Sequence, residues 1–296
     1  MKPTRYRWLL LLWAIFGGVV VFFAIQNLLH PQLKYNSGID RLCHPFDTRV
    51  RYRIGVIDER FGIGRAQLQA LTNEAAQIWH DGTARQWFVY DNNAQLTINL
   101  IYDERQATTT AKQQTQHAIT QMIQSHNQQA QHIDKQRQAL NHNFNTLQQK
   151  IKRWQNAYAA IVQTNPQFST EHQRLLQQKQ VLDKEIHHYQ QQQTRFNEMV
   201  ERFNHQAQTI NDAIDSANQQ FVPHQFDKGI FNGKQINIYE FQSLDDLRLT
   251  LAHELGHALG IGHNDDPSAL MYPYAQSQDM KNFRLKPADI ELLNQR

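Results

Sequence analysis

The sequence predicts an α+β domain that is interrupted by a long antiparallel α-helical coiled-coil hairpin and preceded by an N-terminal transmembrane helix. Three observations support this fold class: an apolar run opens the chain, strand and helix patterns flank its middle, and a seven-residue repeat fills the middle itself. We therefore expect four segments, namely residues 1–30, 31–105, 106–221 and 222–296.

The first segment, residues 1–30, has the composition of a membrane span. Basic residues precede an uncharged run from Trp8 to Ile25, which Leu28 and Leu29 extend. Such a run crosses a ~30 Å hydrocarbon core, and no small-x-small cleavage site follows it. Because positive charge favours the cytoplasmic side, we expect a single-pass anchor with a cytoplasmic N-terminus and an extracytoplasmic domain, periplasmic in a Gram-negative bacterium. The alternative is a signal peptide whose cleavage leaves the protein secreted.

The second segment, residues 31–105, has the pattern of a strand, a helix and further strands. Alternating apolar residues predict the first strand at Val50, Tyr52, Ile54 and Val56. Apolar residues at helical spacing then predict a helix over residues 64–80, which Gly82 closes. Runs rich in β-branched and aromatic residues predict strands at residues 87–90, 96–102 and, in the last segment, 236–239.

The third segment, residues 106–221, is rich in Gln, Asn, His and Ala and is expected to form the hairpin. Apolar residues recur there at alternating steps of four and three over residues 119–161 and again over 175–221. A seam of this kind over many heptads specifies a left-handed supercoil. The break at residues 166–168 predicts a loop that folds the second helix back antiparallel on the first.

The strongest chemical signal is the run HELGHALGIGH at residues 253–263. His253 and His257 are four residues apart, so they lie on one face of a helix, where both imidazoles reach one ion at ~2.0–2.1 Å. Gly260 permits a left-handed turn that returns His263 as a third ligand. Three protein ligands leave a fourth position open, as in catalytic zinc sites. The run therefore predicts one catalytic Zn²⁺ ion.

Glu254 follows the first of these histidines and is the predicted general base. It lies about 100° around the helix from the ligand, where it can hold and deprotonate a water molecule activated by the metal. The alternative is a helix that carries histidines by chance, since the chain has 15 of them. The glycine and the third histidine at fixed offsets favour the metal site.

A second motif, Ser268-Ala269-Leu270-Met271-Tyr272-Pro273, follows the third histidine. HExxHxxGxxH followed by a methionine turn resembles the metzincin zinc proteases, and ALMYP is most similar to their matrixin branch. The resemblance implies that Met271 lies beneath the imidazoles as an apolar floor without binding the metal. Residues 285–293 are similar to the last helix of matrixin catalytic domains, in which Pro287 suits the first turn.

The resemblance implies a metzincin, zincin-like fold in which residues 31–105 and 222–296 form one catalytic domain with a mixed twisted sheet and an active-site helix. It implies a membrane-anchored zinc metalloendopeptidase that hydrolyses peptide bonds of extracytoplasmic proteins, with Glu254 as general base. Residues 236–240 would be the edge strand on which an extended peptide lies.

Two other functions stay open. One is a non-catalytic, membrane-anchored coiled-coil scaffold with a degenerate protease domain, against which the retained Glu254 argues. The other is a zinc hydrolase of a non-peptide amide, which has no positive support in the sequence.

The sequence departs from the matrixin pattern in places. Asn264 occupies the position after the third histidine, where each of the familiar metzincin branches carries its own characteristic residue. In addition, Pro273-Tyr274-Ala275 replaces the Pro-x-Tyr sequence that forms the wall of the specificity pocket in matrixins. The loop that binds structural zinc and calcium has no recognisable counterpart, so only the catalytic zinc is expected. Side-chain preference therefore does not follow from the resemblance.

Cys43 is the single cysteine, so an internal disulfide is excluded. In matrixins an upstream cysteine can occupy the open metal position and keep the enzyme latent, but here no propeptide domain carries it. A free or buried thiol, or one half of an intermolecular bridge, is the favoured interpretation.

Composition limits the partners. A net charge of +3 and the lack of a basic stripe argue against nucleic acid, and no glycine-rich phosphate loop indicates a nucleotide cofactor. The expected partners are a protein or peptide substrate, the membrane through the N-terminal helix, and a protein partner at the hairpin. A spacer with no binding role is the alternative for the hairpin.

Overall fold

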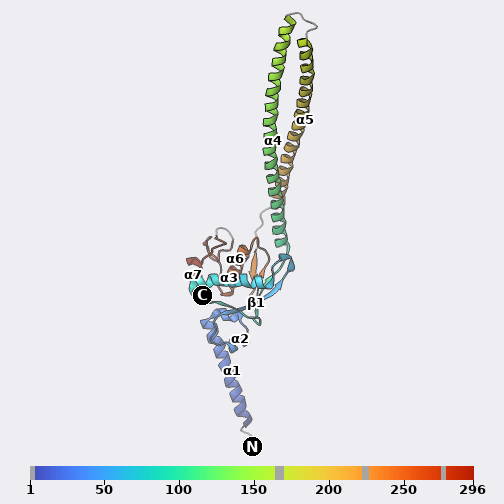
Figure 1. Cartoon of the computed structure of the whole chain (residues 1–296). Coiled ribbons are helices and arrows are strands. Elements are labelled where there is room, and N and C mark those ends of the chain that lie inside the picture. The colour runs from blue at the N-terminus through green and yellow to red at the C-terminus, as the bar shows by residue number, and fades with distance from the viewer. Residues whose placement is uncertain (1–3, 164–169, 222–226, 275–277) are drawn as a thin grey trace. The chain divides into compact units, whose positions relative to one another are not determined.

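The computed structural model describes residues 4–163, 170–221, 227–274 and 278–296 (Figure 1). The chain divides into two compact units. The first unit combines Met1–Ala111 with Pro223–Arg296, and the second is Lys112–Val222. The division after Ala111 falls slightly beyond the expected boundary at residue 106, because the first turns of helix α4 belong to the first unit.

The first unit opens with helix α1 (Thr4–Leu29), whose residues 8–29 are long and apolar enough to cross a membrane. The 3₁₀ helix η1 (Pro31–Tyr35) and the short helix α2 (Gly38–Cys43) follow it. A capping box starts α2, because Ser37 and Asp40 each bond the backbone of the other. A second 3₁₀ turn, η2 (Glu59–Phe61), follows the first strand.

A five-stranded sheet forms the centre of the first unit, in the order β2-β1-β3-β5-β4. The strands are β1 (Val50–Ile57), β2 (Phe88–Tyr90), β3 (Leu96–Leu100), β4 (Gly229–Phe231) and β5 (Gln235–Ile238). The first four in spatial order are parallel, and β4 is antiparallel to β5 at the edge. Ile98 pairs with Ile236, which pairs with Phe231, so one register links the interior strands to this edge.

The edge strand differs from the sequence prediction. Residues 236–240 were expected to form the edge, but β5 lies between β3 and β4, so that prediction is wrong. The edge is β4, which has only three residues and carries Gly229 at its start. A strand so short gives no alternating pattern over several residues, so the sequence offered no signal for it.

Two further local predictions need correction. Val56 was expected on the buried face of β1, but its side chain is 69% exposed, because the pairing register with β3 shifts between Ile54 and Ile57. Gly82 was expected to close a helix, but α3 (Arg65–Thr83) continues through it to Thr83, and the residue after the helix, Ala84, has a left-handed backbone with a φ of 53°. A Cβ at Gly82 would lie 2.5 Å from Leu285, so this glycine permits close packing inside the helix.

Helices α3 and α6 (Leu244–Ala258) form the core with the sheet. Trp79 on α3 is fully buried, and its indole N–H donates to the Ala252 carbonyl of α6 at 2.8 Å. The last helix, α7 (Pro287–Gln295), contributes Leu293 to the same core. The core therefore holds α6 firmly, which fixes the side chains that α6 presents.

The second unit consists of most of α4 (Glu104–Gln163) and of α5 (Thr170–Gln220). Three contacts between the helices show their relative direction: the higher the residue number on α4, the lower the number of its partner on α5. His126 stacks on Phe203, Lys150 forms an ion pair with Glu185, and the Trp154 indole N–H donates to the Leu175 carbonyl. The two helices are therefore antiparallel. The loop expected at residues 166–168 lies outside the described residues.

Candidate metal centre and active site

Helix α6 carries three of the predicted site residues and has a well-built start. The Ser243 hydroxyl caps it by accepting the Asp246 N–H at 3.2 Å. The Lys228 ammonium then binds both carboxylate oxygens of Asp246, at 2.7 and 2.8 Å. Because the helix is capped and packed, His253 and His257 project from one rigid face.

The turn after α6 brings the third histidine back to the helix. Gly260 has a φ of 89°, the left-handed backbone that the sequence predicted there. The Nε2 atoms of His253 and His263 lie 3.3 Å apart, and one nitrogen from each of His253, His257 and His263 falls within 4.8 Å of the others. Within the described part of the chain, this is the one group of three residues whose atoms could converge on an ion.

Two carbonyls orient the imidazole rings of this histidine group. His253 Nδ1 lies 2.7 Å from the Leu270 carbonyl, and His257 Nδ1 lies 2.9 Å from the Ile261 carbonyl. A carbonyl accepts only, so in the neutral ring each Nδ1 carries the proton and each Nε2 presents a lone pair. Backbone partners of this kind commonly fix metal-binding histidines in the required tautomer.

Burial keeps these histidines neutral. The pKa of His253 is lowered to about 4, mainly by burial and then by the neighbouring rings of His257 and His263. Burial likewise lowers the pKa of His257. Neutral imidazole is the form that binds metal, so protons compete weakly for these nitrogens at pH 7.

The histidine group fits a zinc ion. Ligands at ~2.0–2.1 Å in tetrahedral geometry lie about 3.3 Å apart, which is the separation of His253 Nε2 and His263 Nε2. Zinc is bound well by three imidazoles that leave one position free. His253, His257 and His263 therefore could hold zinc.

Glu254 lies on the same helix and points into the first unit. It is only 4% exposed, and its Oε2 atom has no hydrogen-bond partner among the described residues. Burial first, and then the charge of Asp227, raise the pKa of Glu254 to about 7, while a hydrogen bond from the Phe231 backbone opposes the rise. A carboxylate with a pKa near neutrality can both accept and return a proton.

The edge strand β4 lies directly against Glu254. A Cβ added at Gly229 would lie 2.9 Å from both Cγ and Oε1 of this glutamate. Glycine is therefore required here by a close approach of backbone to side chain. The strand and the candidate base are thus in contact.

Met271 is fully buried, and its sulfur lies beside Gly256 of α6. A Cβ at Gly256 would meet the Met271 sulfur at 2.4 Å and the Trp79 ring at 2.7 Å. The absence of a side chain at Gly256 therefore lets the thioether pack directly against the helix that carries the histidines. Because the sulfur packs there, Met271 contributes an apolar contact.

Asp289 is a site residue that the sequence analysis missed. Its carboxylate is fully buried and accepts the backbone N–H groups of Leu270, Met271 and Lys286 at 2.9–3.0 Å. The Asn264 amide donates to it as well, at 3.2 Å. Asp289 therefore joins α7, the methionine turn and the residue after His263.

Cys43 lies far along the chain from these groups, on α2, where it is exposed. It is not a member of the group that could hold an ion. At the departure noted at Asn264, the side-chain amide donates to Asp289 at 3.2 Å, and the backbone N–H donates to the Met271 carbonyl at 3.0 Å. Ala275 of the expected specificity wall lies outside the described residues.

The sequence matches the model of one protein family and short stretches of several known proteins. The family model Peptidase_M10, described as Matrixin, matches residues 46–295, from just before β1 to the end of α7. Matrix metalloproteinase-16 of Rattus norvegicus is 47% identical over 47 residues, which is 16% of this chain and 8% of that protein.

Two other relatives show the same kind of short match. Matrilysin of Felis catus is 53% identical over 38 residues, 13% of this chain and 14% of the relative. Matrix metalloproteinase-15 of Homo sapiens is 41% identical over 61 residues, 19% of this chain and 9% of the relative. The chain thus spans less than one sixth of the length of each of these curated relatives.

Proposed function

Because the chain belongs to the matrixin family, we propose that it is a zinc-dependent endopeptidase that cleaves extracytoplasmic proteins or peptides. The convergence of three imidazoles carries this proposal, with Nε2 atoms 3.3 Å apart in His253 and His263. A buried carboxylate on the same helix, Glu254, adds the proton acceptor that hydrolysis needs.

In the proposed hydrolysis, the three histidines and Glu254 have different roles. His253, His257 and His263 would hold zinc, which when bound would polarise the scissile carbonyl and lower the pKa of the attacking water. Glu254 takes the proton of the attacking water and then delivers it to the departing amine. A pKa of about 7 suits both transfers near neutral pH.

The edge strand β4 supplies the place for the substrate backbone. Its outer side is unpaired in the described sheet, so an extended peptide can add to it as a further strand. Because Gly229 lies against Glu254, a peptide on this edge passes the general base. Ile230, 40% exposed, is available to contact substrate side chains.

The substitution Glu254→Gln tests the enzymatic role. We expect zinc to be retained at about one ion per chain, while cleavage of a quenched fluorescent peptide library falls by about 10³-fold or more. The control is Glu291→Gln, an exposed carboxylate on α7. A membrane scaffold with a degenerate site would show the same peptide turnover in both variants and in the wild type.

We further propose that α1 remains in the chain as a single-pass membrane anchor. Its support is the apolar stretch over residues 8–29, which has a mean hydropathy of 2.6. Carbonate extraction should leave the protein in the membrane fraction, and mass spectrometry should find the N-terminal peptide in the extracytoplasmic form. A soluble protein that begins after residue 30 would support signal cleavage.

We propose that α4 and α5 form a coiled coil that selects protein substrates or binds a protein partner. The support is that Leu147, Leu175 and Leu182 are buried while most other side chains of the two helices are exposed. A buried apolar stripe of this kind is what a coiled coil needs along its helix–helix contact. Deletion of residues 112–220 through a short linker should preserve peptide cleavage and change which proteins are cut.

This deletion must spare the first turns of α4. Gln106 exchanges hydrogen bonds with both the N–H and the carbonyl of Phe241, and Thr109 donates to Glu240 at 3.0 Å. Unchanged protein selectivity in a deletion that keeps these residues would show that the hairpin is a spacer.

A further inference from the structure

We propose that α2 and the turn after it make a second membrane contact, in which Ile39, Leu42 and Phe46 enter the interfacial layer of the bilayer that α1 crosses. We call these three side chains the foot. The inference rests on the proposed anchoring by α1 and goes beyond it, because a single span needs no contact from the following segment.

The foot consists of large apolar side chains that the protein leaves uncovered. Ile39 is 74% exposed, Leu42 50% and Phe46 95%. Ile39 and Leu42 are three residues apart on α2, so they lie on neighbouring turns of one side of the helix, and Phe46 lies in the turn that follows. The exposed Cys43 is the last residue of the helix, between Leu42 and this turn. Single exposed apolar residues are ordinary, whereas three large ones within one short segment indicate a contact surface.

Arg41 holds α2 beside the last turns of α1. Its guanidinium donates to the Gln26 side chain at 2.9 Å and to the Phe23 carbonyl at 3.2 Å, and it lies 4.4 Å from the Phe23 ring centroid. The Gln26 amide in turn donates to the Pro45 carbonyl at 3.1 Å. Arg41 and Gln26 are both buried by these contacts.

These contacts determine the depth of the foot. Gln26 and Phe23 precede the end of the apolar span at Leu29 by about 5 and 9 Å along the helix axis. A segment bonded to both residues lies alongside the end of the span, at the level where hydrocarbon gives way to headgroups. Leu28 and Leu29 are 82% and 64% exposed, so the apolar surface of α1 continues towards this level.

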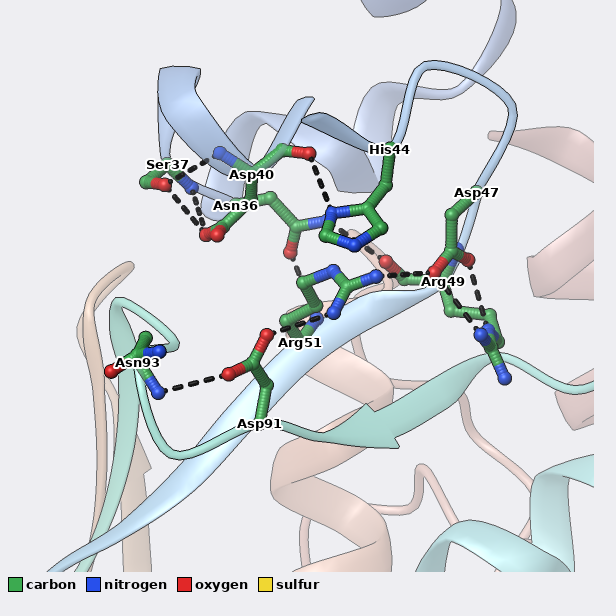
Figure 2. Close-up of polar contacts among 9 residues, drawn as sticks. All are labelled: Asn36, Ser37, Asp40, His44, Asp47, Arg49, Arg51, Asp91 and Asn93. Carbon is green, nitrogen blue, oxygen red and sulfur yellow. Dashed lines mark hydrogen bonds and ion pairs between the residues drawn. The ribbon is translucent and has the colours of Figure 1, made fainter. Parts of the chain in front are cut away.

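The residues just before α2 and just after the foot are joined to the sheet (Figure 2). The Asn36 amide donates to the Arg49 carbonyl at 2.9 Å and accepts the Arg51 N–H at 2.8 Å. Arg51 then pairs with Asp47 at 2.7 Å and with Asp91 at 2.8 Å. The foot is therefore fixed to β1 and to the turn after β2, so a bilayer that holds the foot also orients the sheet.

A bilayer suits this surface better than a second copy of the chain does. Hydrogen bonds tie the segment that carries the foot to the end of α1, whose exposed apolar residues lipid would already cover. Lys34, an exposed cation between α1 and α2, suits the headgroup layer above an inserted apolar face. Amphipathic segments lie in membrane interfaces in this way.

The single cysteine provides the test. The full-length protein is labelled at Cys43 with an environment-sensitive fluorophore, reconstituted into phosphatidylglycerol-phosphatidylethanolamine vesicles and floated on a density gradient. Lipids that carry a nitroxide near the headgroup should quench this label strongly. The comparison label is carried by Ala70→Cys, an exposed position on α3, in a Cys43→Ser background, and it should be quenched at least fivefold less.

Substitution of the foot completes the test. The triple variant I39S/L42S/F46S should still float but should lose most of the quenching at Cys43. The matched control V162S/L176S/V181S, which replaces three exposed apolar residues of the second unit, should behave as the wild type.

The outcomes separate this proposal from the anchoring on which it rests. Floated protein whose Cys43 label is unquenched, or is quenched no more than the label at position 70, overturns the foot and leaves the anchor intact. Protein that does not float overturns both. A disulfide-linked Cys43 dimer formed efficiently by oxidation in dilute vesicles identifies a second copy as the occupant and overturns the membrane contact.

Discussion

The Asp289 carboxylate of α7 accepts the backbone N–H of Met271 at a distance of 2.9 Å. The two residues are both fully buried, and Met271 packs its sulfur against α6, the helix that carries His253 and His257. The C-terminal helix therefore helps to position Met271 next to the candidate metal centre. A buried carboxylate is stable only when donors surround it, and here the backbone N–H groups of Leu270 and Lys286 and the Asn264 amide complete the set.

Replacement of Asp289 by Ala should destabilise the first unit and disturb the metal centre. The change leaves three backbone N–H groups without an acceptor in the interior, which costs about 3 kcal/mol or more in unfolding free energy. Thermal and urea denaturation measure this loss, and zinc affinity should fall with it. Glu291→Ala, an exposed position on the same helix, should stay within about 0.5 kcal/mol of the wild type.

The substitution Gly256→Ala should move Met271. The new Cβ would lie 2.4 Å from the Met271 sulfur and 2.7 Å from Trp79, so we expect a loss of about 1–3 kcal/mol from overpacking. Gly64→Ala is the control, because no atom lies within 4 Å of its added Cβ. In a double-mutant cycle with Met271→Ala, which removes the sulfur, the combined loss should be smaller than the sum of the two single losses. Strictly additive losses would show that this contact is not the cause.

Gly229→Ala should slow catalysis while leaving the metal in place. Its Cβ would press on Cγ and Oε1 of Glu254 at 2.9 Å and on Ile238 at 3.0 Å, which displaces the general base or the edge strand. We expect kcat to fall by about tenfold or more, since small misplacements of a catalytic group are costly. Normal kcat with an altered KM would indicate that β4 serves substrate binding alone.

The stability of the metal-free protein should depend on pH through Glu254. Its pKa rises from 4.5 to about 7 on folding, so its stabilising contribution is complete below pH 4.5 and is lost as the pH rises through 7. The Glu254→Gln variant does not lose this stabilisation, because the glutamine side chain does not titrate. The unfolding free energy of the variant relative to the wild type should therefore increase by about 2–3 kcal/mol across that window.

Chelated samples of both proteins should be compared by urea denaturation between pH 4.5 and 8. The lowered pKa of His253 acts in the opposite direction, but it is present in both proteins and cancels in the difference. A difference that does not change with pH would show that Glu254 is ionised throughout.

The local parts of the site were predictable from the sequence because helix geometry and one left-handed glycine place them. His253 and His257 follow from four-residue spacing, and the φ of Gly260 follows from its place in the motif. Asp289 was missed because the partners that tie it to the methionine turn, Leu270 and Met271, lie 19 and 18 residues away in the sequence. Its one near partner, the Lys286 N–H, is of a kind that a surface carboxylate in the first turn of a helix also has.

The strand edge could not be predicted for a related reason. Whether residues 236–238 lie at an edge depends on which other segment pairs with them, and β4 is only three residues long. The exposed Val56 depends on a register shift between β1 and β3, which arises from pairing. Periodicity describes a strand by itself, so it cannot report these relationships.

X-ray absorption at the zinc edge of the purified full-length protein determines whether His253, His257 and His263 hold one metal ion together. We predict one zinc ion per chain bound by three imidazole nitrogens at about 2.0 Å, with the signal lost in His257→Ala and kept in His187→Ala. Protein that holds no stoichiometric zinc, or a zinc ion bound by fewer than three imidazoles, would overturn the assignment of these three histidines to a metal site.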